Sequence, residues 1–105
     1  MKADRREPRY VFSEQDAAAK SPLARTFLET RSRLNAVVNA ADNYLVKRFY
    51  NLDHNTYLEG ALTAKTKELM GLSVSAALRC DDCISYHVIQ SYRLAATRAE
   101  HSAWR

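Results

Sequence analysis

The chain has 105 residues, of which 47% are hydrophobic and 27% charged, with a net charge of +4 and an isoelectric point near 9.3. This length predicts one small domain, and the mixed composition excludes an intrinsically disordered protein. Only two glycines and two prolines occur, which argues against a turn-rich all-β fold, and no apolar run approaches the ~20 residues of a membrane span. Basic residues are interleaved with acidic ones, so the charge does not favour nucleic-acid binding.

Residues 1–20 are predicted to form a flexible N-terminal arm, because they are charged, interrupted by Pro8 and without sustained periodicity. The charged start is not followed by an apolar stretch, so it does not resemble a secretory signal peptide. We therefore expect a cytoplasmic protein, whose thiols are kept reduced.

Helical signals begin at Ser21 and Pro22, a capping hydroxyl followed by proline at the first helical position. Further along, apolar residues recur at helical spacing and predict a long amphipathic helix over residues 34–50. Residues 52–60 are predicted to be a connector, in which Gly60 can adopt a positive φ.

Thr63 is predicted to cap a strongly apolar and therefore central helix that ends near Leu78. A further helix is expected over residues 81–95, and Thr97 with Glu100 has the spacing of a capping box at the start of another. No strand signal competes. The sequence therefore predicts an all-α fold, a small helical bundle formed by residues 21–105.

The two cysteines of the chain, Cys80 and Cys83, lie three residues apart, and His87 follows four residues later. On a helix, residues three and four apart share a face with Cβ atoms roughly 5–6 Å apart. Two thiols and an imidazole therefore point toward one place, which is the arrangement of a thiol redox centre, and the thiols are close enough for a disulfide. Glu68 taken alone is expected to be an exposed helix residue.

The segments 60–69 and 77–83, followed by His87, resemble the carboxymuconolactone decarboxylase family, and within it the alkylhydroperoxidase (AhpD-like) branch. A glutamate twelve residues before Cys-x-x-Cys-x-x-x-His is the specific part of this signature. The resemblance implies an all-helical fold, assembly into trimers or hexamers, and no cofactor.

The same resemblance implies roles for individual residues. Cys83 would attack a hydroperoxide and become a sulfenic acid, and Cys80, nearer the surface, would condense with it to a disulfide and accept electrons. His87 and Glu68 would form a proton relay that deprotonates Cys83 and protonates the leaving alcohol. A thiol or lipoyl-type donor would reduce the disulfide.

Three departures from the family pattern affect these expectations. Asp82 stands where members of this branch have histidine, and two acids between the cysteines disfavour a thiolate. Ala95 replaces a glycine, at a cost of roughly 1–2 kcal/mol if it must be left-handed. The domain is also short at its C-terminal end, so partner chains are expected to cover exposed apolar surface.

Three alternatives stay open. Cys80, Cys83 and His87 could supply ligands to zinc, with His54, Glu68 or His101 as a fourth. Decarboxylase chemistry, for which the family is named, has no use for a dithiol. A non-enzymatic helical oligomer would use the cysteines only as small buried groups.

Overall fold

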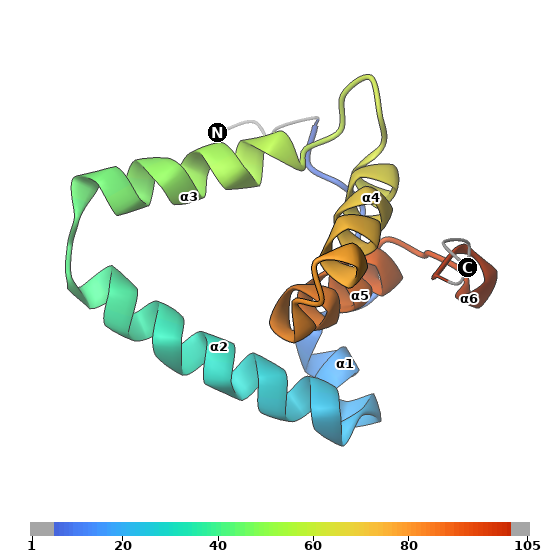
Figure 1. The fold of residues 1–105 in the computed structure, drawn as a ribbon, viewed down its shortest axis with the longest axis horizontal. Coiled ribbons are helices and arrows are strands. Elements are labelled where there is room, and N and C mark those ends of the chain that lie inside the picture. The colour runs from blue at the N-terminus through green and yellow to red at the C-terminus, as the bar shows by residue number, and fades with distance from the viewer. Residues whose placement is uncertain (1–5, 102–105) are drawn as a thin grey trace.

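The computed structural model describes residues 6–101, and all regular elements within this range are α-helices. They are α1 (Glu14–Lys20), α2 (Pro22–Ala40), α3 (Tyr44–Thr56), α4 (Ala64–Ala77), α5 (Asp81–Arg93) and α6 (Arg98–His101). The predicted all-α class is confirmed. Figure 1 shows α4 and α5 side by side, with α2 and α3 forming an open arch that begins and ends near this pair.

The core of the domain is small and is centred on α4 and α5. These two helices form the most closely packed pair, joined by a tight turn at residues 78–80. The buried apolar side chains are few: Leu58, Ala64, Leu72, Ile89 and Ala96. Polar side chains are buried with them, including Glu68 and Ser91. The two central helices therefore bury polar side chains as well as apolar ones.

The prediction of one long helix over residues 34–50 is wrong, because the chain turns at residues 41–43. Asp42 adopts a left-handed φ of 51°, and the Asn43 side chain accepts hydrogen bonds from the backbone N–H groups of Leu45 and Val46. Asn43 thereby starts a new helix, α3. This helix continues to Thr56, through the first five residues of the segment predicted as a connector.

Residues 14–20, within the segment expected to be an arm, form the helix α1. Ser13 and Asp16 make a reciprocal capping box at its start, and α1 packs against α2. Two backbone bonds attach the preceding segment to the body: Val11 N–H donates to the Arg93 carbonyl at 2.7 Å, and Glu59 N–H donates to the Arg6 carbonyl at 2.8 Å.

Several predicted helix starts are confirmed. Ser21, Thr63 and Thr97 each accept a backbone N–H with their side-chain oxygen. The expectation for Gly60 is wrong, since neither glycine has a positive φ. Positive φ values occur instead at Asp42, Arg79 and Ala95.

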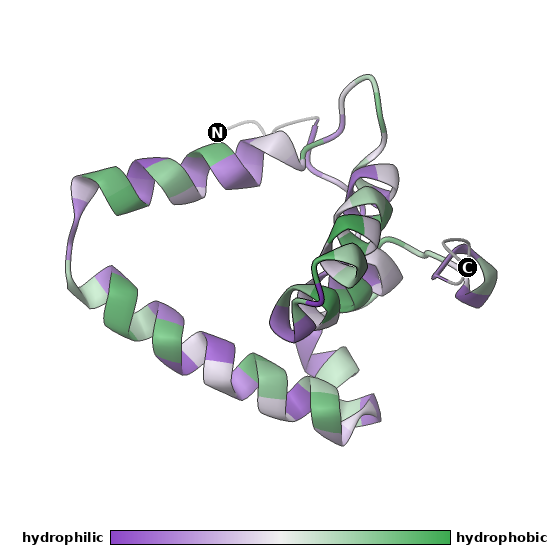
Figure 2. Ribbon diagram, viewed as in Figure 1, coloured by the Kyte–Doolittle hydropathy of each residue, from purple (hydrophilic) through white to green (hydrophobic). Residues whose placement is uncertain are grey.

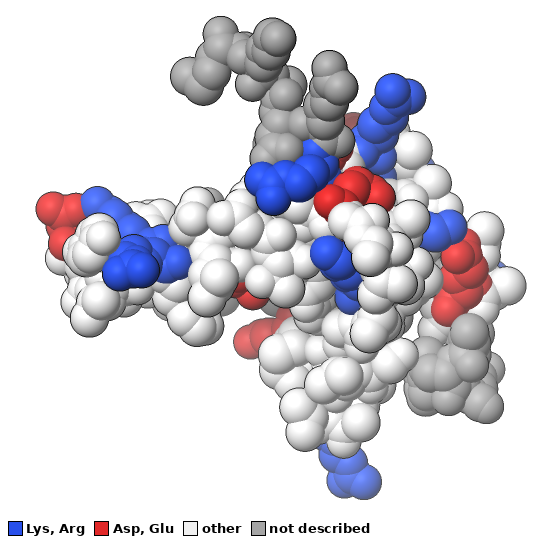
Figure 3. Space-filling model, turned by 90° about the horizontal axis from the view of Figure 1, so that it is seen from above, with Lys and Arg blue, Asp and Glu red and all other residues white. Residues whose placement is uncertain are grey.

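Many large apolar side chains are exposed. Figure 2 shows apolar bands along α2 and α3, and on these helices Leu34, Val37, Leu45, Phe49 and Leu52 are exposed. The charges on the face seen in Figure 3 are scattered, with positive and negative groups next to each other. Among residues 6–101, the helices lack the combination of length and hydropathy needed to traverse a lipid bilayer.

Candidate redox site

The turn between α4 and α5 sets the position of the first cysteine. Arg79 takes a left-handed φ of 56°, and the backbone N–H of Cys80 reaches back to the Ser75 carbonyl at 3.0 Å. This is the Schellman pattern that ends a helix and satisfies its last carbonyls. The next helix begins at once, with Cys80 as its N-cap and Asp81 as its first residue.

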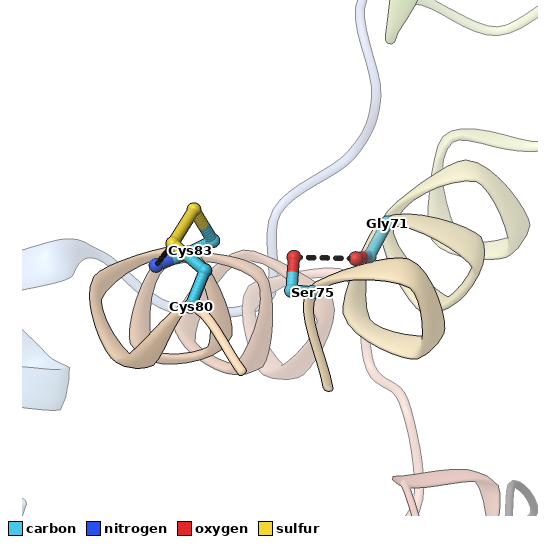
Figure 4. Close-up of a disulfide and its surroundings, with 4 residues drawn as sticks. All are labelled: Gly71, Ser75, Cys80 and Cys83. Carbon is cyan, nitrogen blue, oxygen red and sulfur yellow. Dashed lines mark hydrogen bonds between the residues drawn. A yellow bond between two sulfur atoms is a disulfide. The ribbon is translucent and has the colours of Figure 1, made fainter. Parts of the chain in front are cut away.

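Cys80 and Cys83 form a disulfide at the start of α5, with Cα atoms 5.2 Å apart (Figure 4). The expected proximity of the two sulfurs is therefore present. Their exposure is the reverse of the expectation: Cys80 is half-buried, whereas Cys83 is exposed. The reason is that Cys80 closes the α4–α5 turn, while Cys83 lies on the open side of the first turn of α5.

Glu68 is buried rather than exposed, and it contacts His87. Its Oε2 lies 2.7 Å from His87 Nδ1, and the two side chains are only 7% and 12% exposed. The α4–α5 hairpin brings these residues together across 19 positions of sequence. With the carboxylate ionised, Nδ1–H donates to Glu68 and Nε2 is left as a base.

Gly71 makes room for the imidazole. A Cβ at this position would lie 2.7 Å from His87 Cε1 and 2.9 Å from both ring nitrogens. One turn further along α4, the Ser75 hydroxyl donates to the Gly71 carbonyl at 2.6 Å (Figure 4). The ring therefore packs directly against the backbone of α4. It can do so only because Gly71 has no side chain.

Two tyrosines contact the His87 ring. The centroid of the Tyr86 ring lies 5.3 Å away in an edge-on arrangement, and that of Tyr57 lies 5.8 Å away. Burial, and then the nearby Glu68 carboxylate, raise the pKa of the Tyr86 phenol to about 12. Burial likewise raises the pKa of Tyr57. Both phenols therefore stay neutral at physiological pH.

A cavity of about 730 Å³ opens beside the disulfide and reaches Cys83 and His87 but not Cys80. Its wall combines apolar and aromatic side chains from α2 and α5 with a few charged ones. Its apolar and aromatic lining consists of Leu23, Phe27, Leu34, Tyr57 and Tyr86. The charged groups are Arg31, Asp53 and Asp82, and the Arg31 guanidinium stacks over the Tyr86 ring at 4.6 Å.

The arrangement does not resemble a metal centre. Across the described range, no group of three or more His, Cys, Asp or Glu side chains is placed to hold a metal ion. Cys80 and Cys83 are bonded to each other, His87 Nδ1 faces Glu68, His54 pairs with Glu7, and His101 bonds with Ser91 and Thr97. The residues considered as zinc ligands in that alternative thus have other partners.

The structure brings all four predicted site residues into one region, and it adds Gly71, Tyr86 and Arg31, which the sequence analysis missed. Gly71 carried a signal, because glycine inside an apolar helix costs about 1 kcal/mol relative to alanine and so indicates close packing. Arg31 lies far from the cysteines in the sequence, on an amphipathic helix, and nothing in the residue pattern indicated that it belongs to the site.

The fold and this site define a helical protein with a dithiol–disulfide centre next to a buried Glu–His pair. Residues 43–104 match the model of the carboxymuconolactone decarboxylase family, and the chain belongs to that family.

Relatives agree with this assignment. Two crystal structures of a Thermotoga maritima protein are similar, each with 44% sequence identity over 75% of this chain. The matched regions cover 69% and 67% of the two Thermotoga maritima chains, and the TM-scores are 0.71 and 0.69. One of them is named as a family member with a suggested part in an antioxidative response. An uncharacterised protein of Cupriavidus necator is 38% identical over 42 residues, which span 40% of this chain and 37% of that relative.

Proposed function

We propose that the protein is a thiol-dependent peroxidase and disulfide oxidoreductase that reduces hydroperoxides through Cys83 and Cys80. The observation that carries the proposal is a disulfide next to a cavity that also contains His87, with Glu68 behind the imidazole. The antioxidative role suggested for the Thermotoga maritima relative supports the same chemistry.

The first step requires a thiolate at Cys83. A cysteine of ordinary pKa, about 8.5, is mostly protonated at neutral pH. His87 lies one helical turn after Cys83, and its Nε2 has no hydrogen-bond partner within residues 6–101. This nitrogen takes the thiol proton, and the Glu68 carboxylate stabilises the imidazolium that results.

Oxidation then proceeds by nucleophilic substitution at oxygen. The Cys83 thiolate attacks the terminal oxygen of the hydroperoxide, the O–O bond breaks, and the alkoxide leaves with the proton held by His87. The products are an alcohol and a sulfenic acid on Cys83. The Cys80 sulfur attacks Cys83, a water molecule departs, and the disulfide forms. Two thiol equivalents from a thiol or lipoyl-type donor restore both cysteines.

The buried Glu–His pair gives the site its acid–base function. Glu68 is held by one charge-assisted bond inside a packed interface, so it fixes both the tautomer and the direction of the ring. We also propose that the protein acts in the cytoplasm as a homo-oligomer, as in the trimers or hexamers that the resemblance implies.

Single substitutions test the proposal. Cys83→Ser is expected to abolish peroxide consumption, because it removes the attacking sulfur. Without an added thiol donor, Cys80→Ser is expected to consume one equivalent per chain and then stop, since a sulfenic acid forms but no disulfide within the chain follows. His87→Gln should slow the thiol loss roughly 10²–10⁴-fold, as expected for losing a general base.

The measurement is the rate of thiol loss and peroxide consumption, with and without a dihydrolipoyl donor. Unchanged peroxide consumption in Cys83→Ser would remove the proposal. Turnover of a lactone substrate that survives replacement of both cysteines by serine would favour decarboxylation instead.

A further inference from the structure

The two cysteines of the disulfide are unequally exposed. Cys83 is exposed and lines the large cavity, whereas Cys80 is half-buried and does not line it. The α5 residues that form the cavity wall all lie at or beyond Asp82. A molecule in this cavity therefore meets Cys83 first, with Cys80 on the far side of the S–S bond.

The two sulfurs also differ in how well each holds a negative charge. The Cys80 sulfur is the N-cap of α5 and accepts the backbone N–H of Cys83 at 3.3 Å. A helix N-terminus and a backbone N–H both stabilise a thiolate at that position. Nothing between residues 6 and 101 donates a hydrogen bond to the Cys83 sulfur in this structure.

Thiol–disulfide exchange depends on access to the attacked sulfur and on the stability of the departing thiolate. Attack on Cys83 uses the open sulfur and releases the charge at Cys80, where the N–H group receives it. Attack on Cys80 would need entry at the half-buried residue, outside the cavity, and would release the charge at Cys83. Both factors favour the same direction.

We propose that the reducing thiol enters through the cavity and attacks Cys83, not Cys80. The donor thiolate forms a bond to the Cys83 sulfur, the S–S bond breaks, and its electron pair leaves on Cys80 as a thiolate. A second donor thiol then attacks the donor sulfur of the mixed disulfide, which frees Cys83 as a thiolate and leaves the donor oxidised. Peroxide and reductant thus use one cavity in turn. The inference rests on the proposed function for the origin of the disulfide.

The cavity also selects the charge of the donor. Its described lining holds two carboxylates, Asp53 and Asp82, against one cation, Arg31, which is stacked on the Tyr86 ring. Asp82 immediately precedes the attacked sulfur. A thiol with an apolar body and no charge besides its reacting thiolate fits this wall, whereas a thiol that carries additional carboxylates is repelled.

The first test maps the mixed disulfide. Oxidised wild-type protein is mixed with 2-mercaptoethanol, quenched early with N-ethylmaleimide and digested with trypsin. Cleavage after Arg79 and Arg93 gives one peptide with both cysteines, and fragment masses separate them. We expect mercaptoethanol on Cys83 and maleimide on Cys80. The reverse labelling would overturn the proposal.

The second test compares two neighbouring carboxylates in the first turn of α5. Asp82 lines the cavity next to Cys83, whereas Asp81 adjoins Cys80 and does not line it. Asp82→Asn should accelerate reduction by glutathione about fivefold, the effect of roughly 1 kcal/mol of repulsion at short range in water. It should accelerate reduction by 2-mercaptoethanol less, because the attacking thiolate is the only negative charge on that donor.

Asp81→Asn is the matched control. It should change either rate by no more than about twofold, which corresponds to about half of that repulsion energy. A larger effect from Asp81→Asn than from Asp82→Asn would place the attack at Cys80 and contradict the inference. Both tests use protein oxidised chemically, so they stay informative even if the reduced protein consumes no peroxide. A reduced protein that consumes no peroxide would contradict the proposed peroxidase function, but not the inference that thiols attack Cys83.

Discussion

At the residue scale, the position of the imidazole depends on the absence of a side chain at Gly71. The ring of His87 lies so close to α4 that a Cβ at position 71 would come within 2.7 Å of it. The bond between Glu68 and His87 holds the ring in this place. The acid–base function of the site is thus set by one glycine as well as by the residues that carry charge.

Gly71→Ala is expected to displace the His87 ring and lower the rate of thiol oxidation by peroxide roughly 10- to 100-fold, since misplacement by about 1 Å can cost that much. In an open helix the same change would stabilise by about 0.5–1 kcal/mol. Gly60→Ala is the control, because its Cβ would meet only Lys67 Nζ at an ordinary 3.7 Å. Equal rates in the two variants, measured by stopped-flow thiol loss, would show that the contact does not matter.

The sequence predicted part of this site for physical reasons. Cys80, Cys83 and His87 share one helical face, so periodicity alone placed them together. The partnership of Glu68 with His87 depends on how α4 folds back onto α5, which periodicity does not specify. Only the resemblance to a family connected them. The greater exposure of Cys83 followed from the geometry of the turn at Arg79 and had no signal in the residue pattern.

At the element scale, the turns decide where helices end. Asp42 breaks an amphipathic pattern that runs from α2 into α3, and the periodicity shows no gap there. The prediction of one helix failed because hydrophobic spacing continues through the turn. A stronger signal was Asn43, whose side chain caps α3, since asparagine favours N-caps over helix interiors.

Ala95, two residues after the end of α5, is left-handed with a φ of 65°, the condition raised by the glycine that the resembled family has there. This conformation costs alanine roughly 1–2 kcal/mol. Ala95→Gly is therefore expected to raise the free energy of unfolding by about 0.5–1 kcal/mol, after the greater entropy of glycine in the unfolded chain is subtracted.

Urea denaturation measures the effect. Ala96→Gly is the comparison, because Ala96 is buried and has no positive φ, so the same change there should destabilise. A lower urea midpoint for Ala95→Gly than for the wild type would show that the strain is absent or is compensated elsewhere.

At the scale of the whole molecule, the chain is more open than a compact monomer of its mass. It exposes 8081 Å² of surface, against roughly 6000 Å² expected for a folded monomer of this size. Its radius of gyration is 14.4 Å, against about 13 Å expected. The arch of α2 and α3 contributes to this openness, since neither helix contains a buried residue.

Part of the exposed surface is formed by large apolar side chains on the helices. Met70 and Val74 of α4 and Leu78, which caps its C-terminal end, form a stripe at intervals of four residues, and Leu78 is 74% exposed. Burying such a side chain is worth about 1.5–3 kcal/mol. An excess of this size matches the area that obligate homodimers bury. These features support the proposed homo-oligomer, in which the apolar stripe of each chain would be buried against another copy.

Val74→Glu is expected to weaken this assembly, because it would bury a carboxylate within the apolar contact. Light scattering after size-exclusion chromatography should give the wild type a mass that is a multiple of 12.0 kDa and give the variant a smaller one. Ser32→Glu adds the same charge at an exposed position of α2 outside the stripe and should leave the mass unchanged. A wild-type protein that stays monomeric at micromolar concentration would contradict the proposed assembly, and the excess surface would then need another partner.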